Sequence, residues 1–247
     1  MRSIVRGAID ISARVSNPTL VLLPGMDGTG LLFQPFIEAL GAGGEFDVRT
    51  ITYPEREPLG YEALTDLAFA ALPAGPLMIL GESFSGPIAL ALAVRCADRV
   101  QAVILCCSFV RNPRPGWSWL MPLLRRAPMP SPPSALIARA LLGRHATAPL
   151  QALLAQAMAG VAPDVLRARL IAVGSVDASA ALAALRVPLL YLRASEDRLV
   201  PASVLSWVKR QRPDSSVATF EAPHALLQAC PTQTAAAVRA FVRGLSA

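Results

Sequence analysis

A serine set among small residues, where one apolar run ends and another begins, restricts the fold more than any other feature of this sequence. Residues 80–86 read Leu-Gly-Glu-Ser-Phe-Ser-Gly, and the apolar stretch Pro87–Arg95 follows at once. A strand that turns directly into a helix forces the central residue, here Ser83, into a strained backbone conformation, and the residues two before and two after it must be small. Gly81 and Ser85 meet that requirement. The segment therefore predicts an exposed serine hydroxyl at the N-terminal end of a helix.

The alternative interpretation of this segment is a Gly-Ser loop that only opens a helix. Position 85 also departs from the strict Gly-x-Ser-x-Gly pattern, since serine stands there in place of glycine. Serine is small enough for the turn, so the prediction for Ser83 stands. The dipole of the following helix favours negative charge nearby, which suits a nucleophile that builds up an anion.

Short apolar runs alternate with stretches of helical spacing in the first and last parts of the chain. The runs expected to be strands are Thr19–Leu23, Phe46–Tyr53, Leu77–Leu80, Val100–Cys107, Val187–Leu192 and Ser215–Glu221. The stretches expected to be helices are Tyr61–Leu72, Pro87–Arg95, Pro201–Gln211 and Ala225–Val242. This alternation predicts an α/β fold with a mostly parallel central sheet and helices on both faces.

The alternation stops between residues 111 and 180. Residues 112–133 hold seven prolines, and helical patterns then follow at Ser134–Leu142, Pro149–Ala159 and Pro163–Val173 before the next strand signal. A helical segment between two strands of one sheet predicts an insertion over the edge of that sheet. We therefore expect a helical cap at 111–180 and a core made of residues 1–110 and 181–247.

Composition excludes several classes of protein. The chain of 247 residues fits one large domain or one domain with an insert, and 53% apolar against 16% charged residues excludes a disordered chain. No run of 18 or more apolar residues and no apolar segment typical of a signal peptide occurs, so we expect neither a membrane span nor secretion. The four cysteines are too few for a disulfide scaffold, and none has a histidine at metal-ligand spacing. A cytoplasmic protein without a metal ion is expected.

The net charge of +6 is concentrated in the expected cap. Residues 111–180 hold eight arginines against two aspartates, which accounts for the whole excess. No recognised motif and no interleaving of aromatic and basic residues accompanies this charge, so nucleic-acid binding is not expected.

A serine hydroxyl is a weak nucleophile and needs a base. The sequence has two histidines: His145, beside Arg144 in the arginine-rich insert, and His224, just after the expected strand Ser215–Glu221. We favour His224, because the end of the last strand is where a base could reach over the carboxyl edge of the sheet. The alternative for His224 is a helix-capping or core histidine.

The base in turn needs an acid to orient it. Asp197 lies in the loop after the expected strand Val187–Leu192, at the same sheet edge. Glu196 is its neighbour and Asp214 is a more distant substitute. The alternative for Asp197 is a turn or N-cap acid before the helix that Pro201 starts.

A glycine-rich loop, Pro24–Gly30, follows the expected first strand. Such a loop lets main-chain N–H groups point into a cleft, and the N–H groups of Met26 and Phe84 are candidate donors to a developing oxyanion. The alternative is a phosphate-binding loop. That alternative lacks support, because the G-x-G-x-x-G spacing is absent and no P-loop lysine follows.

Together, the loop Pro24–Gly30, the turn around Ser83, Asp197 before Leu-Val-Pro, and His224 resemble the α/β-hydrolase superfamily, which uses the chain order Ser, acid, His. The resemblance covers nearly the whole chain and implies an α/β-hydrolase fold whose helical cap is the insert. It implies Ser83 as nucleophile, His224 as general base, Asp197 as its orienting acid, and no cofactor. Pro24 departs from the pattern, since many relatives have histidine there.

The cap suggests the substrate. Trp117 and Trp119, with neighbouring leucines and Met121, offer an apolar surface that suits an acyl chain, although they could equally pack the cap onto the core. We therefore expect a serine esterase that acts on small-molecule esters or acyl compounds. The protein is also similar in size, cap charge and expected lack of a signal peptide to the pimeloyl-acyl-carrier-protein methyl ester esterases. That likeness implies an acidic acyl carrier protein as partner. The cap arginines that would bind it are Arg125, Arg126, Arg139 and Arg144.

Other activities remain open on this fold. The same three side chains could transfer an acyl group to an alcohol instead of water. A hydrolase fold can also serve as a non-catalytic ligand receptor, a lyase or a haloperoxidase, because fold does not dictate chemistry.

Overall fold

The computed structural model describes residues 18–41, 46–126 and 133–245, and within 117–125 it describes some residues only by their backbone. Six strands form one sheet in the order β2-β1-β3-β4-β5-β6, and each neighbouring pair is parallel. The strands are β1 (Thr19–Leu23), β2 (Asp47–Thr50), β3 (Leu77–Glu82), β4 (Val100–Cys106), β5 (Leu189–Ala194) and β6 (Ser216–Phe220). The predicted α/β fold with a parallel central sheet is confirmed.

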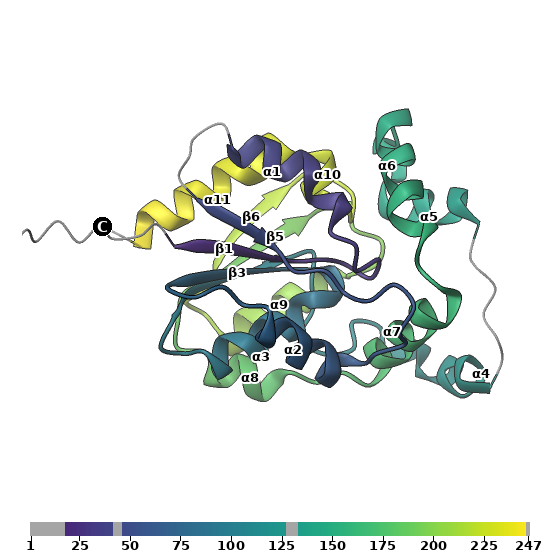
Figure 1. Ribbon diagram of the computed structural model, residues 1–247, viewed down its shortest axis with the longest axis horizontal. Helices are drawn as coiled ribbons and strands as arrows, with labels where there is room; N and C mark the ends of the chain where they lie inside the picture. The colour runs from purple at the N-terminus through teal and green to yellow at the C-terminus, as the bar shows by residue number, and fades with distance from the viewer. Residues whose placement is uncertain (1–17, 42–45, 127–132, 246–247) are drawn as a thin grey trace, which may run out of the picture.

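Helices cover both faces of the sheet (Figure 1). On one face lie α1 (Gln34–Gly41), α10 (Leu226–Ala229) and α11 (Pro231–Leu245). On the other lie α2 (Tyr61–Ala70), α3 (Gly86–Arg95), α8 (Ser179–Ala184) and α9 (Ala202–Gln211). Short 3-10 turns precede several of these helices, including the one at Leu31–Phe33 before α1.

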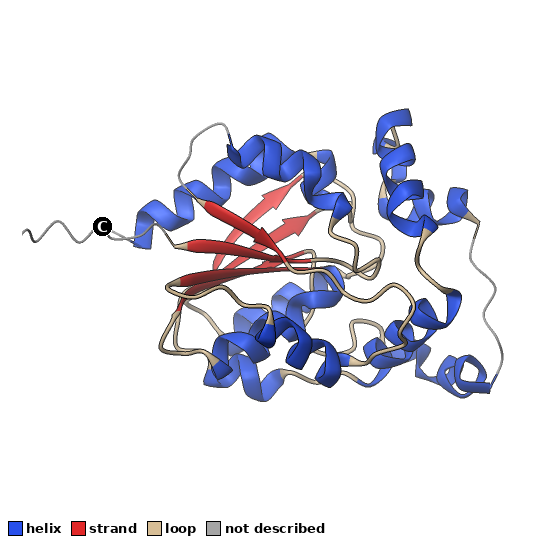
Figure 2. Cartoon of the chain, viewed as in Figure 1, coloured by secondary structure: helices blue, strands red, loops and turns tan. Residues whose placement is uncertain are grey.

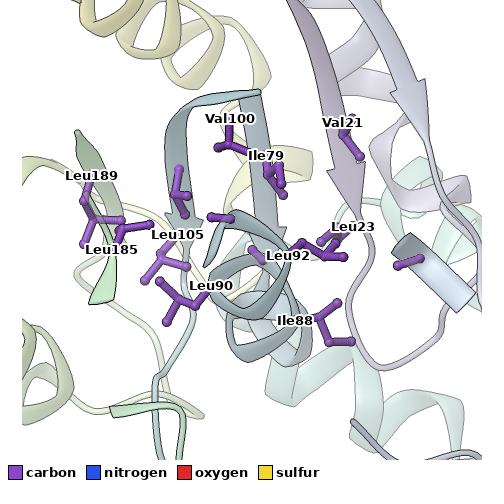
Figure 3. Packing of buried hydrophobic residues seen from close by; sticks show 14 of the residues in the cluster. Val21, Leu23, Ile79, Ile88, Leu90, Leu92, Val100, Leu105, Leu185 and Leu189 are labelled. Carbon is purple, nitrogen blue, oxygen red and sulfur yellow. The ribbon is translucent and has the colours of Figure 1, made fainter. Parts of the chain in front are cut away.

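Strand residues bury alternate side chains against the two helical layers. Leu20 and Leu22 of β1 belong to the cluster under α1 and α11, whereas Val21 and Leu23 belong to the cluster under α3. Figure 3 shows Val21 and Leu23 in this second cluster, beside Ile88 and Leu92 of α3. Because both faces are covered, β1 is apolar throughout instead of alternating with polar residues, which is why its sequence was recognisable as a buried strand.

Four helices of the insert lie at the carboxyl end of the sheet, the end towards which the strand arrows point in Figure 2. They are α4 (Met121–Arg126), α5 (Ser134–Leu141), α6 (Ala148–Ala159) and α7 (Pro163–Ser175), and the chain enters them from β4 and returns to β5. Strand β1 lies between β2 and β3, so the chain adds strands first on one side of β1 and then on the other. In parallel α/β sheets, ligands bind at the carboxyl ends of the strands at such a switch point.

The helices differ from the sequence-based expectations in several details. The expected helix Ala225–Val242 is two helices, α10 and α11, which are separated at Cys230. Pro231 explains the break, because proline has no N–H to continue the first helix but fits the first turn of a new one. Helices α1, α4 and α8 were not predicted, and α4 lies within the proline-rich segment. Among the described residues, no helix is both long and apolar enough to cross a membrane.

Candidate active site

Ser83 lies at the sharp turn between β3 and α3, as the sequence predicts. Its φ angle is +48°, in the left-handed region that non-glycine residues rarely adopt. Gly81 makes the turn possible, because a Cβ atom there would lie 2.7 Å from the Ser85 carbonyl oxygen and 2.9 Å from the Cβ of Ala89. Ser83 remains partly exposed while its neighbours Phe84 and Ser85 are buried. The strain at Ser83 therefore leaves one hydroxyl accessible in an otherwise buried turn.

His224 and Asp197 lie in the loops that follow β6 and β5. The Nε2 atom of His224 is 2.8 Å from the Ser83 Oγ, and its Nδ1 atom is 2.8 Å from the Asp197 Oδ2. The side chains of Asp197 and His224 are each only 5% exposed. Residues 141 and 27 positions apart in the sequence thus form one continuous hydrogen-bonded row.

The orientation of Asp197 is fixed by its own loop. Its Oδ1 atom accepts hydrogen bonds from the N–H groups of Leu199, at 2.8 Å, and Val200, at 2.9 Å. The other oxygen, Oδ2, is left to meet the imidazole of His224. In the tautomer with the proton on Nδ1, His224 donates to this carboxylate, and its Nε2 can accept the Ser83 proton. The row is therefore arranged for proton abstraction from the serine.

The other candidate acids and the second histidine are engaged elsewhere. Glu196 forms an ion pair with Arg144, and Asp214 forms one with Arg212, 2.7 Å away. His145 lies 3.4 Å from a carboxylate oxygen of Glu196. Only Asp197 among these acids lies beside His224.

The glycine-rich loop lies next to Ser83. A Cβ atom on Gly25 would be 4.0 Å from that of Ser83. The carbonyl of Gly25 accepts a hydrogen bond from the N–H of Gly28 at 3.1 Å, and Gly28 has a φ angle of +76°. The C=O and N–H of a trans peptide point in opposite directions. The bond between Gly25 and Gly28 therefore makes the Met26 N–H point away from the interior of the turn that residues 25–28 form. The side chain of Met26 lines the cavity that contains Ser83.

Phe84 has a buried side chain, so only its main chain can take part at the site. Its ring stacks on that of Tyr61 with centroids 4.6 Å apart, and the Tyr61 hydroxyl donates to the Phe84 carbonyl at 3.0 Å. The side chain therefore anchors the turn to helix α2 and leaves the N–H as the group that could meet an oxyanion.

An acidic residue that the sequence analysis did not single out lies directly before the serine. Glu82 is 6% exposed and lines the same cavity. One of its oxygens accepts a hydrogen bond from Nε2 of Gln228 at 3.0 Å. Burial raises the pKa of Glu82 to about 7, and this bond with Gln228 opposes the rise. The carboxyl thus titrates near neutrality beside the serine.

Arg169, on helix α7, is a second residue whose place the sequence did not reveal. It is 0% exposed, and its guanidinium donates to the carbonyls of Met26 at 2.7 Å, Asp27 at 2.9 Å and Pro54 at 2.9 Å. In the sequence it was one of eight arginines in the insert, with no local pattern to separate it from the rest.

A cavity of about 400 Å³ opens above Ser83 and His224. Its walls are mostly apolar, and most of the apolar residues come from helices α5, α6 and α7 of the insert. The apolar wall residues are Met26, Leu32, Ile137, Ala140, Leu141, Leu154, Met158, Leu166, Leu170, Leu199 and Ala225. The main chain of Leu141 is also tied to the core, because its carbonyl accepts a hydrogen bond at 3.0 Å from the N–H of Ala225, next to His224. Helix α5 and the loop that carries His224 are thus hydrogen-bonded to each other where both line the cavity.

Trp119 does not take the place that its sequence suggested. Trp119 is 74% exposed and does not line this cavity. The side chain of Trp117 lies outside the described residues. The apolar wall comes instead from α5 to α7, whose leucines and Met158 follow the tryptophans in the sequence.

The cap arginines differ in their availability. Arg126 and Arg139 are exposed, whereas the side chain of Arg125 lies outside the described residues. Arg144 bonds to Glu196 and Glu221 of the core, each 2.5 Å away. Its charge is thus engaged within the chain. In the part of the chain that the structure describes, no cluster of three or more His, Cys, Asp or Glu side chains could hold a metal ion.

Comparison with known proteins agrees with the fold. Residues 20–237 match the sequence profile of the alpha/beta hydrolase family, so the chain belongs to this family. A carboxylesterase of the thaumarchaeon Nitrososphaera gargenis superposes with a TM-score of 0.76 at 15% identity, over 94% of this chain and 92% of that one. A lipase-esterase related protein from Clostridium acetobutylicum gives 0.75 at 16% identity, over 92% and 95%.

One curated relative is more similar in sequence over a shorter range. The chloroplastic phytyl ester synthase 1 of Arabidopsis thaliana is 35% identical over 121 residues, which are 45% of this chain. The match spans only 16% of that protein's own length.

Proposed function

We propose that this hydrolase cleaves carboxylic esters of apolar acyl chains, with Ser83 as nucleophile, His224 as general base and Asp197 as its orienting acid. The observation that carries the proposal is the row of two 2.8 Å contacts from Ser83 through His224 to Asp197 on the floor of an apolar cavity. Residues 111–180 serve as the cap that supplies most of the apolar residues of the cavity wall.

The reaction starts with attack of the Ser83 oxygen on the ester carbonyl carbon. His224 takes the serine proton at Nε2, and the buried Asp197 stabilises the imidazolium. The carbonyl oxygen becomes an oxyanion that accepts hydrogen bonds from the N–H groups of Met26 and Phe84. His224 then gives its proton to the leaving alkoxide, and the acyl group stays on Ser83. Attack by water, with its proton taken by His224, releases the acid and restores the serine.

The cavity supports this substrate class. Its walls offer a long acyl chain many apolar contacts and few polar partners, which disfavours sugars and peptides. A series of p-nitrophenyl esters from acetate to palmitate tests this proposal, because kcat/KM should rise with chain length until the cavity is full. A flat or falling series from acetate onward would contradict an acyl-chain site.

Labelling separates an enzyme from a ligand receptor on the same fold. A fluorophosphonate probe reacts only with an activated serine, so the wild-type protein should be labelled and Ser83→Ala should not. An unlabelled wild-type protein, shown to be folded by circular dichroism, would contradict the proposed activity.

Acyl transfer to an alcohol is the second candidate. The observation that favours it is the similarity to a protein named phytyl ester synthase, since an ester synthase forms the bond that an esterase breaks. Both reactions share the acyl-Ser83 intermediate and differ in whether water or an alcohol attacks it. Product analysis with a long-chain alcohol present distinguishes them: a new ester supports transfer, and free acid alone supports hydrolysis.

A more specific proposal is that an acyl carrier protein binds to the cap and carries the acyl group to the enzyme. With Arg144 bound to core acids, it rests on Arg126 and Arg139, which are exposed. An acidic carrier would be attracted to these two charges and deliver its acyl chain to the cavity beneath.

A further inference from the structure

Arg169 reaches from the cap to the loop that would bind the oxyanion. It lies on α7, and it is the largest side chain in the described core that is fully buried. A buried guanidinium is costly unless its N–H groups are hydrogen-bonded. Its Nη1 and Nη2 atoms donate to three main-chain carbonyls, at Met26, Asp27 and Pro54, whereas its buried Nε has no hydrogen-bond partner among the described residues. Burial lowers the pKa of Arg169, and the nearby charges of Asp27 and Glu55 oppose that shift.

These bonds fix the direction of consecutive peptide groups. The carbonyl of Gly25 is held by the Gly28 N–H, and the next two carbonyls, of Met26 and Asp27, are held by Arg169. Each peptide is planar, so holding its oxygen also sets the direction of its N–H. The peptide that carries the Met26 N–H therefore lies in a short segment where no carbonyl can turn without losing a hydrogen bond.

The fit between the loop and the guanidinium is close. A Cβ atom on Gly28 would lie 2.6 Å from Nη1 and 2.9 Å from Nη2 of Arg169. Glycine at this position thus serves two purposes, since it accepts the positive φ angle and lets the guanidinium approach the loop. A planar guanidinium with five N–H groups can bond several carbonyls at once, whereas a lysine offers one nitrogen.

We propose that Arg169 is a positioning residue, through which the cap holds the Pro24–Gly30 loop in the geometry that stabilises the oxyanion. The cap is then part of the reaction machinery as well as the wall of the acyl cavity, because removing its guanidinium loosens the donor at Met26. This inference rests on the proposed serine hydrolase function.

The test compares Arg169→Lys and Arg169→Met with Arg167→Met, a control on the same helix whose guanidinium pairs with Asp164, 3.0 Å away. We expect kcat towards a p-nitrophenyl ester to fall about 10- to 100-fold in both Arg169 variants, with KM changed less than about threefold. The control should stay within about twofold of wild type. Unchanged kcat in a folded Arg169→Lys protein would overturn the proposal.

A second measurement separates positioning of the oxyanion site from packing of the cap. A trifluoromethyl ketone with an acyl-like chain adds to an active serine and places an oxyanion in the site, whereas the matching alcohol fills only the cavity. Arg169→Lys should lose affinity for the ketone in proportion to kcat/KM and keep its affinity for the alcohol. An equal loss for both ligands would overturn the proposal.

A second variant keeps the proposal testable if the Arg169 variants do not fold. Gly28→Ala pushes against the guanidinium from the loop side and should give the same loss of kcat with little change in KM. Wild-type kcat in this variant would overturn the proposal. Failure of the proposed hydrolase function is recognised by a different result: the wild-type protein would be neither labelled by fluorophosphonate nor active on any ester of the series.

Discussion

The hydroxyl of Ser85 donates a hydrogen bond to the main-chain carbonyl of Pro24. Because that hydroxyl has one proton, the contact of 2.7 Å between Ser85 and Tyr53 must have the tyrosine as donor. The turn that presents Ser83 is thereby tied to the loop that carries Met26. Serine at position 85, which the sequence pattern showed only as a tolerated departure from glycine, has a structural role of its own.

Ser85→Ala should therefore destabilise the protein. The substitution leaves a buried carbonyl and a buried tyrosine hydroxyl without their partner, which costs about 1–3 kcal/mol of unfolding free energy. Urea denaturation followed by circular dichroism measures this loss. Ser206→Ala removes an exposed hydroxyl that bonds within its own helix and should cost less than about 0.5 kcal/mol. Equal stabilities for the two variants would contradict the assigned role.

Glu82 makes stability depend on pH in a particular direction. Its pKa is raised in the folded protein from 4.5 to about 7, so the folded state holds a proton that the unfolded state has lost. The contribution of Glu82 to stability is fully present below pH 4.5 and falls by about 3 kcal/mol as the pH rises to about 7, since each pKa unit corresponds to about 1.4 kcal/mol.

Glu82→Gln should abolish this slope. The variant is expected to be more stable than wild type at pH 8 and similar to it at pH 5, measured as unfolding free energies in urea. Glu62→Gln, which changes an exposed glutamate of α2, should retain the wild-type slope. Parallel pH profiles for Glu82→Gln and wild type would show that the buried carboxyl does not titrate as described.

Ala140 of α5 lines the cavity and offers a way to shorten it. Ala140→Phe should fill space that the far end of an acyl chain occupies, with a loss of about 0.8 kcal/mol for each methylene excluded. We expect kcat/KM for the decanoate ester to fall about 10-fold or more, and that for the acetate ester to change little. Ala135→Phe places the same ring on an exposed position of the same helix. If both variants leave the chain-length profile unchanged, the chain does not bind along α5.

Arg126 and Arg139 test the carrier-protein proposal. Reversing both charges to glutamate should lower kcat/KM on carrier-bound esters several-fold at low salt, and spare p-nitrophenyl esters. The loss should shrink as salt is added, because exposed charges are screened. Arg210→Glu, an exposed charge on α9 of the core, is the control. A similar loss on both kinds of ester would argue against a carrier protein.

Features set by local sequence were predictable. Buried parallel strands are apolar on both faces, so β1 and β4 stood out, and the strained turn at Ser83 requires small neighbours wherever it occurs. Asp197 and His224 could be selected because each follows a strand, and parallel strands end at one edge of the sheet. The contacts at 2.8 Å bring these side chains together.

Features set by tertiary contacts were not predictable. Nothing in the sequence around Arg169 distinguishes a buried arginine from the exposed Arg139, because its partners are main-chain carbonyls over a hundred residues away. Trp119 looked like a cavity wall by composition, yet it is exposed, since which face of the insert meets the core depends on how the helices pack. The ion pairs of Arg144 with core acids were hidden for the same reason.

The hydrogen bond between the Leu141 carbonyl and the Ala225 N–H connects the side of the cavity to the residue after His224. We therefore expect a substrate too bulky for that side to strain the backbone that holds the imidazole, so that under the proposed function a poorly fitting ester binds but is turned over slowly.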